Sequence, residues 1–231
     1  MNQGPSDPPE AHNPKRASAS AELPPSARLA NHPLLEHLLT ILRDRETQAA
    51  RFRETLEALG HLLAYEAIRD VPLEVASVRT PLEEMQAPRL RRRVVIVPIL
   101  RAGLGLATGM LRLLPEAGVG HIGMARNEST LESEGYYEKL PEALGEATVL
   151  LADPMLATGG SAVSAVGLLK KRGARQVIFV GVLASPAGVR TLAEAHPDVE
   201  IVVSAVDREL DERGYILPGL GDAGDRYFGT I

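Results

Sequence analysis

The stretch from Ala147 to Val166, ATVLLADPMLATGGSAVSAV, constrains the fold more than any other part of the chain. Its apolar run Val149–Ala152 predicts a strand buried on both faces, because a half-exposed strand would alternate apolar and polar residues. The strand should end at Asp153-Pro154, since proline has no N–H for a central ladder. A loop of small residues follows, and apolar residues at helical spacing begin at Val163. The sequence therefore predicts a buried strand, an acidic turn, a glycine loop and a helix.

The glycine loop, Ala157 to Ser161, has the composition of a phosphate-binding loop. Its glycines allow close approach of an anion, and the following helix start offers backbone N–H groups and a positive dipole end. It is not a P-loop, which would need a lysine. A plain strand-to-helix connection capped by Ser161 is the alternative. Asp153 favours a functional site, because a carboxylate at the strand end can accept hydrogen bonds from two sugar hydroxyls. The Asp153 carboxylate and the glycine loop together suit a ribose 5-phosphate.

The run DPMLATGGS resembles the loop with which the uracil phosphoribosyltransferase family binds 5-phospho-α-D-ribose 1-diphosphate (PRPP). Pro154 stands where other phosphoribosyltransferases carry a second acidic residue, as in the uracil branch. The resemblance extends from about Asn31 to the C-terminus. It implies PRPP contacts from every residue of the loop: Asp153, Pro154, Met155, Leu156, Ala157, Thr158, Gly159, Gly160 and Ser161.

Composition and length are consistent with one α/β domain. The chain has 231 residues, of which 45% are hydrophobic and 24% charged, so a substantial core is expected. The net charge of −5 argues against nucleic-acid or membrane partners, and the absence of cysteine excludes disulfides and thiol catalysis. We expect a cytoplasmic enzyme, with a disordered extension over residues 1–26 and a single domain over residues 27–231.

The remaining pattern predicts a central, mostly parallel sheet flanked by helices, like that of type I phosphoribosyltransferases. Two amphipathic helices are expected between residues 32 and 70, on faces that include Leu34, Leu35, Leu38, Leu39 and Leu42, then Phe52, Leu56, Leu59 and Leu63. The prolines of residues 71–88 predict an extended β-arm. Further expected elements are strands at 94–97, 177–183 and 201–205 and a helix at 186–195. The basic cluster Arg89–Arg93 is either a solvated strand entrance or a contact for RNA or an anionic effector.

Two arginines follow predicted strands. VPILRAGLG resembles the pyrophosphate loop of the family, which implies that Arg101 clamps the leaving group; a guanidinium bonds phosphate oxygens bidentately. MARNESTLESEGYYEKLP resembles the family's MYRNEETLEPVPYFQKLP, with Ala125 in place of a tyrosine. That resemblance implies a mobile hairpin over residues 127–139 that lowers Arg126 onto the pyrophosphate.

The tail YILPGLGDAGDRYFGT is too glycine-rich for a core element, and it resembles the segment with which the family holds its base. The resemblance implies uracil contacts, largely through main-chain groups, from Ile216, Gly221, Asp222 and Ala223. It also places Asp222 near PRPP, through Mg²⁺ or water. A compact loop with no site is the alternative.

The resemblance implies a pentosyl-transferring glycosyltransferase of UMP salvage, which converts uracil and PRPP to UMP and diphosphate. It implies catalytic roles for Arg101, Arg126, Asp153 and Asp222, Mg²⁺ carried by PRPP, a homodimer or higher homo-oligomer, and GTP as an allosteric activator. No direct protein ligand for the metal is expected. The alternatives are a phosphoribosyltransferase for another base and a nucleotide-sensing regulator that binds RNA.

Overall fold

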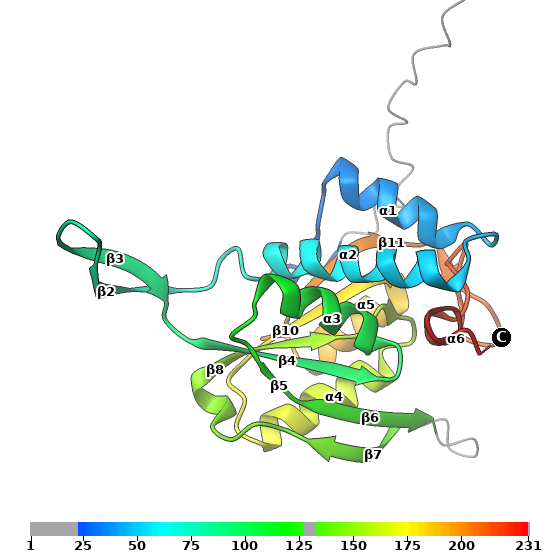
Figure 1. Ribbon diagram of the computed structural model, residues 1–231. Coiled ribbons are helices and arrows are strands. Elements are labelled where there is room, and N and C mark those ends of the chain that lie inside the picture. Colours follow the sequence, from blue (N-terminus) through cyan, green and yellow to red (C-terminus); the bar gives the residue numbers. More distant parts are fainter. Residues whose placement is uncertain (1–22, 127–132, 231) are drawn as a thin grey trace, which may run out of the picture.

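A computed structural model describes residues 23–126 and 133–230 (Figure 1). Its main sheet has the order β1-β11-β10-β8-β4-β6-β7, with β5 and β9 attached to β4 and β10. The pairs of this sheet are parallel except β6–β7, which is antiparallel. The mostly parallel sheet predicted from the sequence is therefore confirmed. Its strands are β1 (Ala27–Leu29), β4 (Arg93–Leu100), β5 (Gly118–Val119), β6 (His121–Arg126), β7 (Ser133–Lys139), β8 (Ala147–Ala152), β9 (Met155–Leu156), β10 (Gln176–Ala184) and β11 (Glu200–Val206).

Helices cover both faces of this sheet, as its doubly buried strands require. One core cluster joins the sheet to α1 (Pro33–Arg43), α2 (Ala49–Ala67) and α3 (Gly103–Leu113). A second cluster joins the opposite face to α4 (Gly160–Lys171) and α5 (Pro186–Ala195). A 3₁₀ turn at Leu144–Glu146 leads into β8, whose six residues are all buried.

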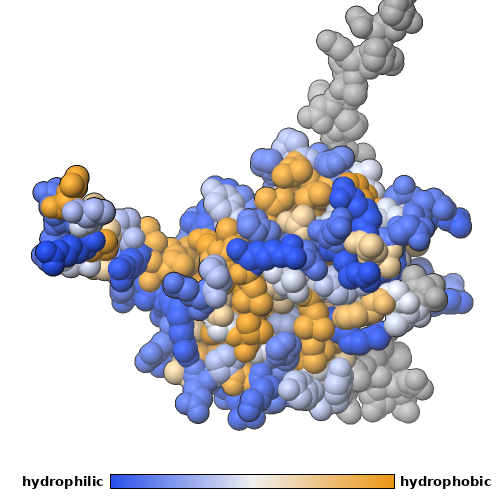
Figure 2. Space-filling view, in the orientation of Figure 1, coloured by the Kyte–Doolittle hydropathy of each residue, from blue (hydrophilic) through white to orange (hydrophobic). Residues whose placement is uncertain are grey.

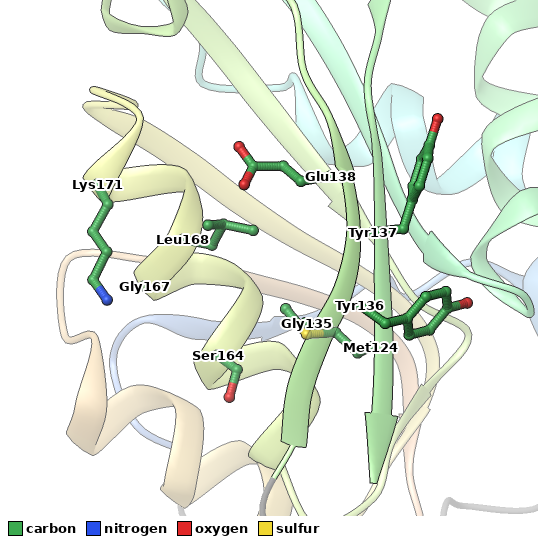
Figure 3. A pocket seen from close by; sticks show the side chains of 9 residues that line it. All are labelled: Met124, Gly135, Tyr136, Tyr137, Glu138, Ser164, Gly167, Leu168 and Lys171. Atoms are coloured by element: carbon green, nitrogen blue, oxygen red, sulfur yellow. The ribbon is translucent and has the colours of Figure 1, made fainter.

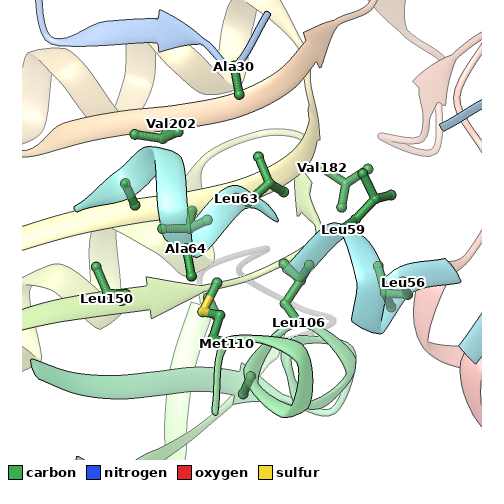
Figure 4. Close-up of a cluster of buried hydrophobic side chains, with 14 of the residues drawn as sticks. Ala30, Leu56, Leu59, Leu63, Ala64, Leu106, Met110, Leu150, Val182 and Val202 are labelled. Carbon is green, nitrogen blue, oxygen red and sulfur yellow. The ribbon is translucent and has the colours of Figure 1, made fainter. Parts of the chain in front are cut away.

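The first cluster shows why the predicted helices pack where they do (Figure 4). The face of α2 with Phe52, Leu56, Leu59 and Leu63 is fully buried, as predicted. On α1, Leu35, Leu39 and Leu42 are buried, but Leu34 is 43% exposed, so the predicted face was one residue too wide. Helices α2 and α3 lie in close contact because a glycine of each faces the backbone of the other: a Cβ on Gly60 would lie 2.3 Å from the Leu106 carbonyl oxygen, and one on Gly109 would lie 1.8 Å from the Glu57 carbonyl oxygen.

The predicted β-arm is confirmed as a two-stranded ribbon that projects from the domain (Figure 1). It consists of β2 (Leu73–Arg79) and β3 (Glu84–Leu90), paired in antiparallel register from Leu73↔Leu90 to Arg79↔Glu84. The basic cluster spans the end of β3 and the start of β4. Arg92 and Arg93 donate to backbone carbonyls of the segment before β8, so part of this cluster has a structural role.

Both ends of the domain differ in detail from the sequence prediction. Residues 23–26 precede β1 in the structure, and Ser26 accepts a hydrogen bond from the Ile201 N–H at 2.8 Å. The predicted disordered extension otherwise falls on residues 1–22, outside the described residues. The prediction that the tail is no core element was wrong: Ile216, Leu220, Ala223 and Tyr227 belong to the first core cluster. The tail folds as β13 (Ile216–Leu217), which pairs with β12 (Glu209–Leu210), and the short helix α6 (Ala223–Phe228).

Candidate active site

The glycine loop joins β8 to the start of α4, as the sequence predicted. Between β8 and the glycine loop lies one element that was not expected, β9, which pairs with β10. Gly159 is the N-cap of α4, with φ of +87°, a conformation that L side chains rarely adopt. Because this N-cap is a glycine, no side chain caps the start of α4, and the first turn of the helix carries no acidic residue. This helix start therefore suits an anion such as phosphate.

Helix α5, on the same face of the sheet, supports the loop through contacts that were not predicted from the sequence. Ser185, the N-cap of α5, donates from Oγ to the Ala157 carbonyl oxygen at 2.6 Å, and its N–H donates to Leu156 O at 3.0 Å. Gly188 leaves room for the loop, because a Cβ there would lie 2.4 Å from both carbonyl oxygens. The loop backbone is therefore positioned by contacts that involve none of its side chains.

Asp153 lies at the carboxyl end of β8, where the sequence placed it. Its N–H donates to Val180 O at 3.1 Å, and its side chain accepts a long hydrogen bond of 3.4 Å from the Met155 N–H. Burial raises the pKa of this carboxyl to about 7, and the Met155 hydrogen bond opposes the shift. Asp153 is thus near its titration midpoint at neutral pH. Donors from a bound sugar would stabilise its charged form.

The loop after β4 lies between the end of β8 and the C-terminal segment. A Cβ on Gly103 would lie 2.3 Å from Ala152 O, so this loop lies against the end of β8. The Leu100–Arg101 peptide bond is cis. The Arg101 guanidinium forms an ion pair of 3.2 Å with Asp225 and lies 5.5 Å from the Phe228 ring centroid. Its side chain is 57% exposed and therefore accessible to an anion.

The predicted base-binding residues surround two tight turns of the tail. Ile216 is 3% exposed and Ala223 2%, whereas Gly221 is exposed with φ of +79°. Asp222 is exposed and caps α6, accepting from the Asp225 N–H at 2.9 Å. A Cβ on Gly224 would lie 3.7 Å from the Ala102 Cβ, so this tail lies beside the loop that carries Arg101.

The single arginine of the tail, Arg226, fixes this segment to the domain, a role that was not predicted. It donates to Leu220 O at 2.7 Å and to Asp44 O at 2.7 Å. Its guanidinium also lies 4.4 Å from the Phe52 ring centroid, and burial lowers its pKa. These contacts join the tail to the end of α1 and to α2.

Arg126 is the one predicted site residue whose side chain falls outside the description. Its backbone lies at the end of β6, opposite Ser133 of β7, which confirms the predicted hairpin for its described strands. Residues 127–132, the tip of that hairpin, lie outside the described residues, so the mobility of the hairpin and the role of Arg126 stay predictions.

A hollow of about 560 Å³ lies between the β6–β7 hairpin and α4 (Figure 3). Its lining includes Tyr136, Glu138, Leu168 and Lys171. None of the residues that line it is a predicted site residue. The candidate site instead lies at the carboxyl ends of β4 and β8, where ligands of open α/β sheets bind.

No group of three or more His, Cys, Asp or Glu residues that could hold a metal ion occurs in the part of the chain that the structure describes. Within the same residues, no helix has the length and apolarity needed to cross a membrane.

The fold and the site together define an α/β domain of the type I phosphoribosyltransferase kind, with a glycine loop after a central strand of a mostly parallel sheet. The family model described as uracil phosphoribosyltransferase matches residues 29–230. The chain belongs to the uracil phosphoribosyltransferase family.

Individual relatives agree with this assignment. Uracil phosphoribosyltransferase of Listeria innocua is 52% identical over 206 residues, which cover 89% of this chain and 99% of the relative. The enzyme of Streptococcus pneumoniae is also 52% identical, over 87% of this chain and 96% of its own. Among solved structures, the AQ2163 protein from Aquifex aeolicus matches with a TM-score of 0.84 and 42% identity, over 88% of this chain and 98% of its own.

Proposed function

We propose that this chain transfers the ribose 5-phosphate group of PRPP to uracil, which yields UMP and diphosphate. The observation that carries the proposal is the meeting of three segments at the carboxyl ends of the sheet. The loop after β4 contacts the end of β8 through Gly103, and it contacts the tail through the Arg101–Asp225 ion pair. A phosphate loop, an accessible cation and a base-reading segment are the parts that this transfer requires.

Each segment has one role in the reaction. The loop from Asp153 to Ser161 and the start of α4 hold the 5-phosphate, while the Asp153 carboxylate accepts from the ribose hydroxyls. Arg101, with Arg126, stabilises charge that develops on the departing diphosphate, an electrostatic effect. The tail holds uracil in line with the anomeric carbon, which is a positioning effect. No covalent nucleophile is needed, and the chain has no cysteine.

Magnesium fits this site as a companion of PRPP. Mg²⁺ usually binds through one or two carboxylates together with substrate phosphates. The exposed carboxylate of Asp222 and the half-buried carboxylate of Asp225, which pairs with Arg101, suit that arrangement through water. When bound, the ion neutralises charge on the diphosphate.

Replacing Asp153 with Asn should weaken PRPP binding about 10- to 100-fold, because the hydroxyl donors lose a charged acceptor worth about 1.5–3 kcal/mol. The unliganded variant should be at least as stable as the wild type at pH 8. Burial raises the pKa of this carboxyl, so its charge opposes folding above the unfolded pKa. Calorimetric titration with PRPP and a thermal melt check both. An unchanged PRPP affinity would remove Asp153 from the ribose site.

The affinity for PRPP should also depend on pH through Asp153. Because its pKa in the free protein is about 7 and ribose donors favour the carboxylate, the affinity should fall as the pH drops below 7, by up to about tenfold per unit. Above about pH 8 the contribution of this group should be constant. The phosphate of PRPP titrates nearby, so the Asp153→Asn variant serves as the control. A wild-type profile identical to that of the variant would contradict the assignment.

Labelled uracil, PRPP and Mg²⁺ test the proposed reaction directly. UMP and diphosphate should form in equal amounts, and EDTA should stop the reaction until Mg²⁺ is restored. A nucleotide-sensing regulator that binds RNA would form no UMP. A phosphoribosyltransferase for another base would consume PRPP only with that base.

The projecting arm supports the proposal of a homodimer or higher homo-oligomer. Apolar side chains gather on it (Figure 2), where Leu73 is 59%, Val75 74%, Leu82 95% and Met85 47% exposed. Exposed apolar surface of this kind is typical of protein interfaces. Light scattering after size exclusion should give a mass of two or more chains, and Val75→Glu should lower it. Activation by GTP and a cytoplasmic location stay predictions.

A further inference from the structure

We propose that Arg43 and Asp207 are positioning residues that hold the base-reading tail in the conformation that accepts uracil. Neither residue belongs to a segment with a predicted role in binding, and the inference rests on the proposed function of the tail. Arg43 is the last residue of α1, and Asp207 follows the last residue of β11.

The two side chains form a bidentate ion pair. Arg43 Nη1 donates to Asp207 Oδ2 at 2.7 Å, and Nη2 donates to Oδ1 at 2.6 Å. The pair is largely shielded from water, since the side chain of Asp207 is 8% exposed and that of Arg43 26%. A shielded, two-pronged pair fixes direction as well as distance, which a single surface contact does not do.

The same pair holds both main-chain groups of one residue in the tail. The Gly219 N–H donates to Asp207 Oδ2 at 2.9 Å, and the Gly219 carbonyl oxygen accepts from Arg43 Nη1 at 2.8 Å. Gly219 lies in the turn that separates Ile216 from Gly221. Its φ is +64°, and a Cβ there would lie 2.0 Å from the Ile216 carbonyl oxygen. The ion pair therefore binds the turn at Gly219, where the backbone passes close to the Ile216 carbonyl oxygen.

This geometry fixes the direction of the main-chain donors and acceptors of the base site relative to the sheet. The main-chain groups of Ile216 and Gly221 can recognise uracil only when their direction is fixed, since backbone donors and acceptors cannot exchange roles. Asp207 follows β11, which pairs with β10, and it lies at the carboxyl ends of the parallel strands, as Asp153 does after β8. Arg43 approaches from the end of α1. The turn is thus held by two elements of the domain. Loosening it should weaken uracil binding, because the groups proposed to bind the base flank the turn. PRPP binding should change little, because α5 holds the glycine loop and Asp222 is held separately by its cap of α6.

The chain provides a matched control at the other end of β11, between β1 and the first residue of β11. Arg28 and Glu200 form an ion pair of 2.6 Å, with side chains 28% and 34% exposed. Glu200 begins β11, whereas Asp207 follows its end. The control pair therefore lies at the amino ends of the parallel strands, away from the candidate site at their carboxyl ends. Arg28→Lys makes the same chemical change as Arg43→Lys without touching the tail.

The test compares Arg43→Lys and Asp207→Asn with Arg28→Lys. Lysine keeps the charge but cannot donate to both Asp207 and Gly219 through a planar fork. We expect the KM for uracil at saturating PRPP to rise about tenfold or more in both tail variants, as for a lost charge-assisted hydrogen bond. The dissociation constant for PRPP should stay within about twofold of the wild type, given that one such bond is a tenfold effect. Arg28→Lys should leave both quantities unchanged.

A role in stability alone would give a different result. It would lower the melting temperature of the tail variants while the folded enzyme kept its wild-type KM for uracil, and this result would overturn the inference. In Arg43→Ala, millimolar guanidinium should restore the KM for uracil toward the wild-type value. Should that variant not fold, Arg43→Lys decides alone. A wild type that forms no UMP would refute the proposed function itself, whereas normal uracil kinetics in Arg43→Lys would refute only the positioning role.

Discussion

Cytosine should be used at least about 10⁴-fold less efficiently than uracil, as kcat/KM, since sites that hydrogen-bond a substrate reject mismatched analogues by about 10⁴–10⁵. Uracil presents an N3–H donor beside an O4 acceptor, and cytosine presents an acceptor beside an amino donor. The groups proposed to read this edge are main-chain groups of Ile216, Gly221 and Ala223, whose polarity is fixed. Cytosine would therefore meet donor with donor and acceptor with acceptor. 5-Fluorouracil keeps the uracil edge and should be accepted.

The same prediction extends to the backbone of the tail. Gly221→Val should depress kcat/KM for uracil severely, because Gly221 has φ of +79°, where a β-branched residue is strongly disfavoured. Space is not the reason, since a Cβ there would lie 3.7 Å from the nearest side-chain atom, Arg226 Cδ. Gly173→Val is the matched control: its φ is +91°, its surroundings are open, and it follows the far end of α4. Ile216→Val should be mild. Equal use of the two bases, or an indifferent Gly221→Val, would mean that the base is read elsewhere.

Arg101→Ala should lower kcat/KM by about 10²–10³, the usual effect of removing one group that stabilises developing negative charge. In the free protein this guanidinium pairs with Asp225, so the diphosphate would share it with that carboxylate or replace it. Arg101→Lys should recover only part of the loss, because lysine has no bidentate fork. The same substitution at Arg126 should also depress kcat/KM.

Arg112→Ala provides the control for the change in charge. Arg112 lies near the end of α3, the helix that Arg101 precedes, and forms an ion pair of 2.7 Å with Glu57 while 66% exposed. Its removal should leave kcat/KM near the wild-type value. Steady-state kinetics with PRPP as the varied substrate would measure all of these variants. Wild-type kinetics in Arg101→Ala would contradict the proposed role in diphosphate departure.

Much of this architecture could be predicted because the signals were local. The buried run before Asp153, the proline after it and the glycines that follow specify strand, turn and helix start within one segment. The helix Pro186–Ala195 was predicted with the bounds that the structure has, since Ser185 and Pro186 are a typical N-cap and first helical residue.

The contacts that hold the site could not be predicted in this way, because they join residues far apart in the chain. Arg43 and Asp207 are separated by 164 positions, and the sequence contains no pattern that pairs them. Asp207 did carry one usable signal: like Asp153, it is an acidic residue directly after a buried strand, and such residues gather at one edge of a parallel sheet. The core role of the tail was also missed, because burial of Leu220 and Tyr227 depends on helices that lie more than a hundred residues earlier.

The most direct test of one shared site is a crystal structure of the protein with UMP. The phosphate should lie on the loop before α4, the ribose hydroxyls should donate to Asp153, and the uracil edge should meet the main chain of Ile216, Gly221 and Ala223. UMP bound with its phosphate or its base away from these segments, for example in the hollow between α4 and the β6–β7 hairpin, would contradict the account.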